Sequence, residues 1–110
     1  MAEYVMIPFH VNEDKIEEIK QVIKELIVKV KENEPGVLLY QSMQLKNDKA
    51  SFIHLIIFKD NDAHLIHRKA TYVMDFVKNL YSFCPHEPTP VFLESLDACG
   101  SLFEAMQQAD

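Results

Sequence analysis

The sequence predicts an α+β fold of the ferredoxin-like type, in which two helices cover one face of a four-stranded antiparallel sheet in the order β-α-β-β-α-β. Apolar residues recur at helical spacing in two long segments, 13–33 and 71–84. Four segments rich in strand-forming residues, 4–11, 37–45, 52–58 and 90–96, surround them. The third of these is apolar on both of its faces, which means that both faces of the sheet must be covered.

The first strand and the first helix follow from two different periodicities. Between residues 4 and 11, Val5, Ile7 and Phe9 share one side of the chain, and Pro8 restricts this strand to an edge or to an early end. Asn12 is expected to cap the helix, with acidic residues in the first turn. The apolar stripe of the helix consists of Ile16, Ile19, Val22, Ile23, Leu26, Ile27 and Val30.

The remaining elements are bounded by proline, glycine and short polar residues. Glu34-Pro35-Gly36 ends the first helix and begins the second strand, and a polar turn over 46–49 joins that strand to the next as a hairpin. Asp60-Asn61-Asp62 supplies caps for a short helix through about Arg68. The longer helix over 71–84 carries the stripe Tyr72, Val73, Phe76, Val77, Leu80 and Phe83, and the last strand follows over 90–96.

The chain is expected to form one domain over residues 1–96 with a tail over 97–110. Its 110 residues and 48% hydrophobic content are typical of a single globular domain. Leu102, Phe103 and Met106 stand at helical spacing, so the tail is expected to form a short helix. Cys84 and Cys99 form no Cys-x-x-Cys unit and are expected to be free thiols.

The composition also restricts the partners and the compartment. A net charge of -6 argues against nucleic acid and anionic membranes, and no apolar run reaches the roughly 18 residues of a membrane span. The N-terminus lacks the features of a signal peptide, so a cytoplasmic location is expected. The sheet face that the helices leave bare is expected to pack against the same face of a second copy, giving a homodimer.

Two segments carry a resemblance to a known family. The segment Glu34-Pro35-Gly36-Val37-Leu38-Leu39-Tyr40 and the run Phe58-x-Asp60-x-x-Ala63-x-x-x-His67 resemble motifs of the antibiotic biosynthesis monooxygenase family. In that family the first reads Glu-Pro-Gly-(Cys or apolar)-x-x-Tyr and the second Trp-x-Asp-x-x-Ala-x-x-x-His. The resemblance covers about residues 4–96 and implies a dimeric α/β barrel with a pocket in each subunit, between the helices and the sheet.

The resemblance implies a cofactor-independent monooxygenase that acts on a small aromatic phenol or quinol. Such an enzyme needs a group that accepts a proton, an apolar cavity and donors for the resulting anion, but no metal and no cofactor. The candidate catalytic residues are His67, His64 and Tyr72. The candidate substrate-binding residues are His54, Tyr40, Phe52, Phe58, Phe76 and Met43.

The sequence is also compatible with other functions. Ile56 stands where relatives often have an acidic residue and Phe58 where they have tryptophan, which favours a non-catalytic ligand-binding or stress-associated dimer as the alternative. An isomerase or lyase on the same scaffold is a third hypothesis. Haem degradation is disfavoured because Val77 aligns with the iron-ligating histidine of haem-degrading relatives. His64 and His67 have no obvious third partner for a metal, and both His67 and His54 also fit purely structural roles.

Overall fold

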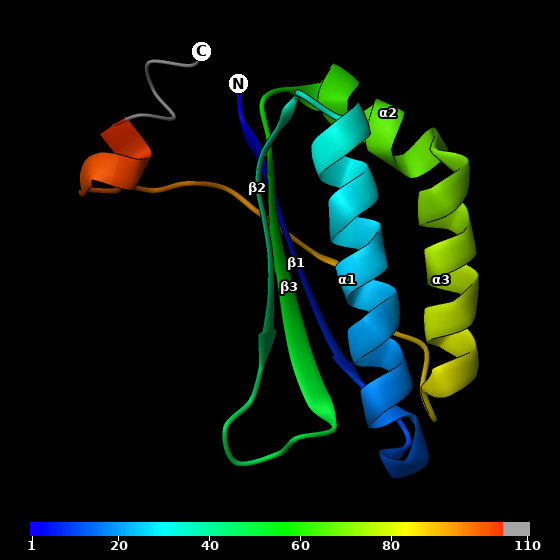
Figure 1. Cartoon of the computed structure of the whole chain (residues 1–110). Coiled ribbons are helices and arrows are strands. Elements are labelled where there is room, and N and C mark those ends of the chain that lie inside the picture. Colours follow the sequence, from blue (N-terminus) through cyan, green and yellow to red (C-terminus); the bar gives the residue numbers. More distant parts are fainter. Residues whose placement is uncertain (105–110) are drawn as a thin grey trace.

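The computed structural model describes residues 1–104, which form a single antiparallel sheet with helices on one face. The sheet has the strand order β2-β3-β1-β4, and α1 and α3 lie side by side against it while α2 crosses one end (Figure 1). This is the predicted ferredoxin-like arrangement. The elements are β1 (Glu3–His10), a 3₁₀ turn (Glu13–Lys15), α1 (Ile16–Asn33), β2 (Val37–Gln44), β3 (Ser51–Phe58), α2 (Asn61–Lys69), α3 (Thr71–Phe83) and β4 (Val91–Leu93).

The main core lies between the sheet and the two long helices. Buried side chains of α1 and α3 meet buried aromatic residues of the central strands, where the rings of Phe9 and Phe52 stack with 5.3 Å between their centroids. Burial of each such aliphatic or aromatic side chain contributes about 1.5–3 kcal/mol to stability. The helical contributors are Ile19, Ile23, Leu26 and Val30 from α1 and Val73, Phe76 and Leu80 from α3.

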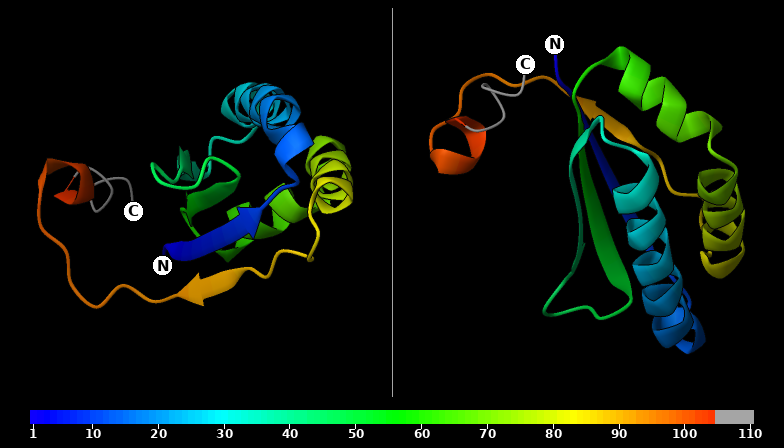
Figure 2. Two further views of the ribbon diagram at one scale, coloured as in Figure 1. Left: turned by 90° about the horizontal axis from the view of Figure 1, so that it is seen from below. Right: turned by 45° about the horizontal axis from the view of Figure 1, so that its top comes forward.

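Strand β3 places apolar side chains on both faces of the sheet. Its residues alternate, so that every second side chain from Phe52 to Phe58 is buried under the helices, while Ile53, Leu55 and Ile57 face the other way. Ile57 is nevertheless 3% exposed, because Tyr4 and Leu39 pair with it across the strands on either side. Residues 101–104 form a helical turn on this far side of the sheet (Figures 1 and 2). The rest of the expected tail helix, with Met106, lies outside the described residues.

Four local details differ from the expectations. β1 continues past Pro8 to His10 and lies between β3 and β4, so Pro8 neither ends this strand nor places it at an edge; β4 pairs only with Tyr4–Met6 and does not reach Pro8. Asn12 makes no side-chain cap; its backbone N–H donates to the Phe83 carbonyl instead, at 2.8 Å, which fastens the start of α1 to the end of α3. A register shift between Val37 and Leu39 turns Val37 toward the helix-side core, although simple alternation puts both residues on one face. The last strand, β4, ends at Leu93, where the chain leaves the sheet edge (Figure 2). By contrast, the expected cap from Asp60 is present, with its carboxylate accepting from the Ala63 N–H at 2.8 Å.

Among residues 1–104, no helix has the length and the apolar character that crossing a membrane requires. Both cysteines are free thiols, as expected. Cys84 is half-buried and packs against the main core, and Cys99 is exposed.

Gly36 allows β2 and α2 to approach closely, and we expect the substitution Gly36→Ala to destabilise the protein. A Cβ at this position would lie 2.6 Å from the Cβ of Ala63, so one of the two elements must shift. Overpacking of this kind costs about 1–3 kcal/mol, measurable by urea unfolding. The double variant Gly36→Ala/Ala63→Gly should lose less stability than the two single variants together, because the second change removes the clashing methyl group. Strict additivity would contradict this account.

Candidate functional site

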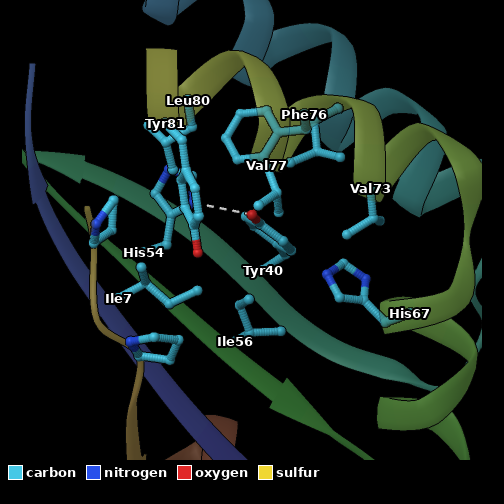
Figure 3. A pocket seen from close by; sticks show the side chains of 13 residues that line it. Ile7, Tyr40, His54, Ile56, His67, Val73, Phe76, Val77, Leu80 and Tyr81 are labelled. Atoms are coloured by element: carbon cyan, nitrogen blue, oxygen red, sulfur yellow. Dashed lines mark hydrogen bonds between the residues drawn. The ribbon is translucent and has the colours of Figure 1, made fainter. Parts of the chain in front are cut away.

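A cavity of about 90 Å³ lies between the sheet and α3, in the region shown in Figure 3. Its lining is mostly apolar and comes from α1, α2 and α3, from β1, β2 and β3, and from the proline-rich connection before β4. Aliphatic residues of α3 and Ile56 of β3 form much of the wall. The polar side chains that reach it include Tyr40, His54 and His67, so the cavity combines an apolar interior with a few converging polar groups.

A buried carboxylate orients His67. Glu34 follows the last turn of α1, and its side chain is only 3% exposed. The Nδ1–H of His67 donates to Glu34 Oε1 at 2.8 Å, and the hydroxyl of Tyr72 donates to Glu34 Oε2. These two donors satisfy a carboxylate whose burial would otherwise be costly. Because Nδ1 carries the proton, Nε2 of the neutral imidazole bears a lone pair, and none of the described residues forms a hydrogen bond with it.

His67 is held in its neutral form at pH 7. Burial lowers its pKa, and this effect outweighs the nearby Glu34 carboxylate, which acts in the opposite direction; the nearby His64 lowers the pKa slightly further. An imidazole that is neutral, fixed by a carboxylate and adjacent to an apolar cavity has the properties of a general base.

A second polar pair joins β2 and β3 inside the cavity. The Tyr40 hydroxyl and Nδ1 of His54 are 2.9 Å apart and share a hydrogen bond, drawn in Figure 3. His54 lies between aromatic neighbours, edge-on to Phe9 at 5.0 Å and stacked with Phe76 at 6.0 Å. Burial lowers the pKa of His54 to about 4 and raises the pKa of Tyr40. Both groups are therefore neutral over the physiological range.

The buried imidazole of His54 predicts acid lability. Its pKa is about 4 in the folded protein and about 6.5 in the unfolded chain, so only the unfolded chain takes up the proton between these values. Stability is therefore full above pH 6.5 and falls as the pH decreases toward 4. Between pH 7 and pH 5 the free energy of unfolding should fall by about 2 kcal/mol on this account. Urea unfolding of wild type and His54→Phe at both pH values measures it, and equal pH dependence in the two proteins would contradict it.

The structure gathers only some of the predicted site residues at the cavity. His67, His54, Tyr40 and Phe76 line it. Tyr72 reaches the site only through Glu34 and itself lines a separate hollow between α1 and α3.

The other predicted residues lie elsewhere. His64 faces Glu3 of β1, with Nδ1 2.7 Å from the carboxylate oxygen, and stacks on the buried ring of Phe58 at 4.5 Å. Neither ring is part of the cavity wall. Phe52 and Met43 line a different hollow beside α1, at the opposite end of the hairpin from α2. These residues do not line one cavity because the neighbours of each side chain depend on how the helices dock on the sheet.

Glu34 is not among the site residues predicted from the sequence. It was expected only to belong to the helix-ending Glu-Pro-Gly segment, yet it connects two of the three candidate catalytic side chains. Two features of the sequence could have indicated a role for Glu34. Its carboxylate stands between an amphipathic helix and an apolar strand, and it belongs to the first of the two segments that resemble the family motifs. Within residues 1–104, no group of three His, Cys, Asp or Glu side chains is arranged to hold a metal ion.

Comparisons with known proteins agree with the fold and the motifs. The sequence profile of the family described as antibiotic biosynthesis monooxygenase matches residues 4–79. A crystal structure of an antibiotic biosynthesis monooxygenase is similar at a TM-score of 0.79 and 20% identity, covering 88% of this chain and all of that one. A comparison with curated proteins gives no match.

Two bacterial structures show the same similarity of fold. A protein of Caulobacter crescentus CB15 has a TM-score of 0.80 and 25% identity over 87% of this chain and 91% of its own. Rv0793 from Mycobacterium tuberculosis has a TM-score of 0.82 at 13% identity, covering 91% of this chain and 100% of its own.

Proposed function

Because the chain belongs to the antibiotic biosynthesis monooxygenase family, we propose that it binds a small phenol or quinol in the cavity and oxidises it with dioxygen, without a cofactor. The observation that carries this proposal is the buried Glu34–His67 pair, 2.8 Å between carboxylate oxygen and Nδ1, with His67 at the wall of an apolar cavity. The cavity volume of about 90 Å³ limits the ligand to at most a single aromatic ring, because it is smaller than the cavity of about 150 Å³ that holds benzene, and the side chains of the wall must move to admit the ring.

In the proposed reaction, Nε2 of His67 accepts the proton of the substrate hydroxyl. Glu34 keeps the imidazole in the required tautomer and stabilises the imidazolium that forms. The apolar wall excludes water, which strengthens the electrostatic interaction between the imidazolium and the new phenolate. The electron-rich phenolate then reacts directly with dioxygen at a ring carbon.

The overall reaction balances without another reductant. One O–H bond and one ring C–H bond of the phenol break, together with both bonds of dioxygen. One oxygen atom becomes a ring carbonyl, and the other leaves as water with both hydrogen atoms. The phenol loses four electrons and becomes a quinone, and dioxygen gains the same four electrons.

The second candidate function is ligand binding without chemistry. It is supported by the positions of His64 and Tyr72, which lie outside the cavity wall, so that of the three predicted catalytic residues His67 alone lines it. We do not propose haem degradation. Val77 lines the cavity, and by the resemblance it occupies the position of the iron-ligating histidine in haem-degrading relatives; an isopropyl group cannot ligate iron.

The proposal includes a homodimer formed through the sheet face that the helices leave bare. Ile53 and Leu55 are only half-buried on this face, and Met43 is 38% exposed. Exposed apolar surface of this kind is typical of interfaces, and a two-fold arrangement covers both copies at once.

Oxygen uptake tests the proposed function. The protein is screened for thermal stabilisation by phenols, quinols, flavins and haem, and each stabilising compound is then supplied in an oxygen electrode. We expect one dioxygen consumed per phenol, a quinone product and no peroxide, so that catalase releases no oxygen. The variant His86→Ala, which changes an exposed histidine outside the cavity, should behave as wild type. Stabilisation by a phenol without oxygen uptake would favour the ligand-binding alternative.

A further inference from the structure

His54 carries a buried polar atom that the protein leaves without a partner. The residue is 1% exposed, and its Nε2 forms no hydrogen bond with any residue in the described part of the chain. A buried donor or acceptor without a partner is costly, and most such groups in native proteins are satisfied. The hydrogen bond to the Tyr40 hydroxyl accounts for Nδ1 of this imidazole between Phe9 and Phe76, but nothing in the described part of the chain accounts for Nε2.

The hydrogen bond to Tyr40 determines which nitrogen carries the proton. A phenol is a stronger donor than a neutral imidazole N–H, and an imidazole nitrogen is a stronger acceptor than a phenol oxygen. We therefore assign the Tyr40 hydroxyl as the donor to Nδ1 of His54. The proton of the neutral ring then resides on Nε2, which makes this buried atom an unpaired donor on a residue that lines the cavity.

The cavity thus holds two imidazoles of opposite polarity. Figure 3 shows the ring of Tyr40 between them. Its centroid is 5.4 Å from that of His54 and 6.0 Å from that of His67. His67 offers a lone pair on Nε2, and His54 offers a proton on Nε2.

We propose that the Nε2–H of His54 binds an oxygen acceptor of the ligand, a carbonyl or a second ring oxygen, distinct from the hydroxyl that faces His67. His54 is a specificity-determining residue in this account, because a ligand without such an oxygen leaves the buried donor unpaired. Tyr40 is a positioning residue that fixes the tautomer of His54. The inference rests on the proposed function only in taking this cavity as the ligand site, and it does not require the reaction with oxygen.

A pair of nearly isosteric probes tests the inference in the absence of oxygen. 4-Hydroxybenzaldehyde has a carbonyl oxygen at the position where 4-vinylphenol has a CH₂ group. Calorimetry should show that wild type binds the aldehyde about 10-fold more tightly, the discrimination expected when a buried donor loses its acceptor. The variant His54→Phe should bind the two probes with about equal affinity. The matched control His86→Phe should retain the wild-type preference, because His86 is exposed and outside the cavity.

A second measurement requires no substitution and guards against a variant that fails to fold. In wild type labelled with ¹⁵N, the Nε2–H signal of His54 should shift on addition of the aldehyde and stay unchanged on addition of 4-vinylphenol. Equal affinity for the two probes, binding of neither at millimolar concentration, or an unprotonated Nε2 in the free protein would overturn the inference. If His54 discriminates between the probes but no phenol supports oxygen uptake, the inference about His54 holds and the proposed oxygenase activity does not.

Discussion

The variant His67→Gln is expected to lower kcat/KM for a phenol substrate about 100- to 10,000-fold, the usual contribution of a general base. Glutamine retains a side-chain donor for Glu34 but has no nitrogen that accepts a proton near neutral pH. The loss should appear mainly in kcat, since the apolar wall that binds the ring is unchanged. Steady-state oxygen uptake over a range of phenol concentrations separates kcat from KM.

Two further variants identify the origin of this loss. Glu34→Gln should lower kcat about 10- to 100-fold, because it removes the charge that orients His67 and stabilises the imidazolium. His64→Gln should leave kcat near the wild-type value, because His64 contacts Glu3 and lies outside the cavity wall. Full activity in His67→Gln would exclude His67 as the base.

The variant Leu55→Glu is expected to be a monomer, because it disrupts the interface of the proposed homodimer. Leu55 lies on β3, on the sheet face that the helices leave bare. In the proposed dimer, the carboxylate of a glutamate at this position would be buried against the same face of the partner. The cost of burying an unpaired charge is several kcal/mol per ion, and two-fold symmetry doubles it. Light scattering coupled to size-exclusion chromatography measures the molar mass directly.

The matched control for this change is Val28→Glu, which places the same charge on an apolar position of α1 that is 53% exposed. We expect this variant to remain a dimer. A monomeric wild-type protein, or a Leu55→Glu protein that still elutes as a dimer, would exclude the interface proposed here.

The fold could be predicted from the sequence because its determinants are local. The apolar stripe of α1 and the alternation of β3 are visible within a few residues. Because the chain has few elements and short connections, only a few arrangements can cover one face of the sheet. The bulge that redirects Val37 could not be predicted in this way, because a register shift belongs to the pairing of β2 with β3 and is not visible in the alternation of β2 alone.

The candidate site could be predicted only in part, because it depends on contacts between distant segments. His64 and His67 are three residues apart on α2, yet the first contacts Glu3 and the second Glu34. Sequence spacing placed the two histidines together, whereas the docking of α2 across the end of the sheet separates their partners (Figure 1). The unpartnered Nε2 of His54 likewise follows from packing around β3, which no local pattern reveals.

In the proposed reaction neutral His67 removes the proton of a bound phenol, and the pH dependence of kcat/KM tests this step. Because burial lowers the pKa of His67 below its ordinary value of 6.5, the base is active at and above that pH and is lost as the pH falls through the lowered pKa. We predict a plateau from about pH 6.5 to about pH 10, where the free phenol itself ionises, and a tenfold decrease per pH unit on the acid side. A rate that instead rises tenfold per pH unit all the way to the pKa of the free phenol would contradict the account, because the substrate would then be phenolate already formed in solution.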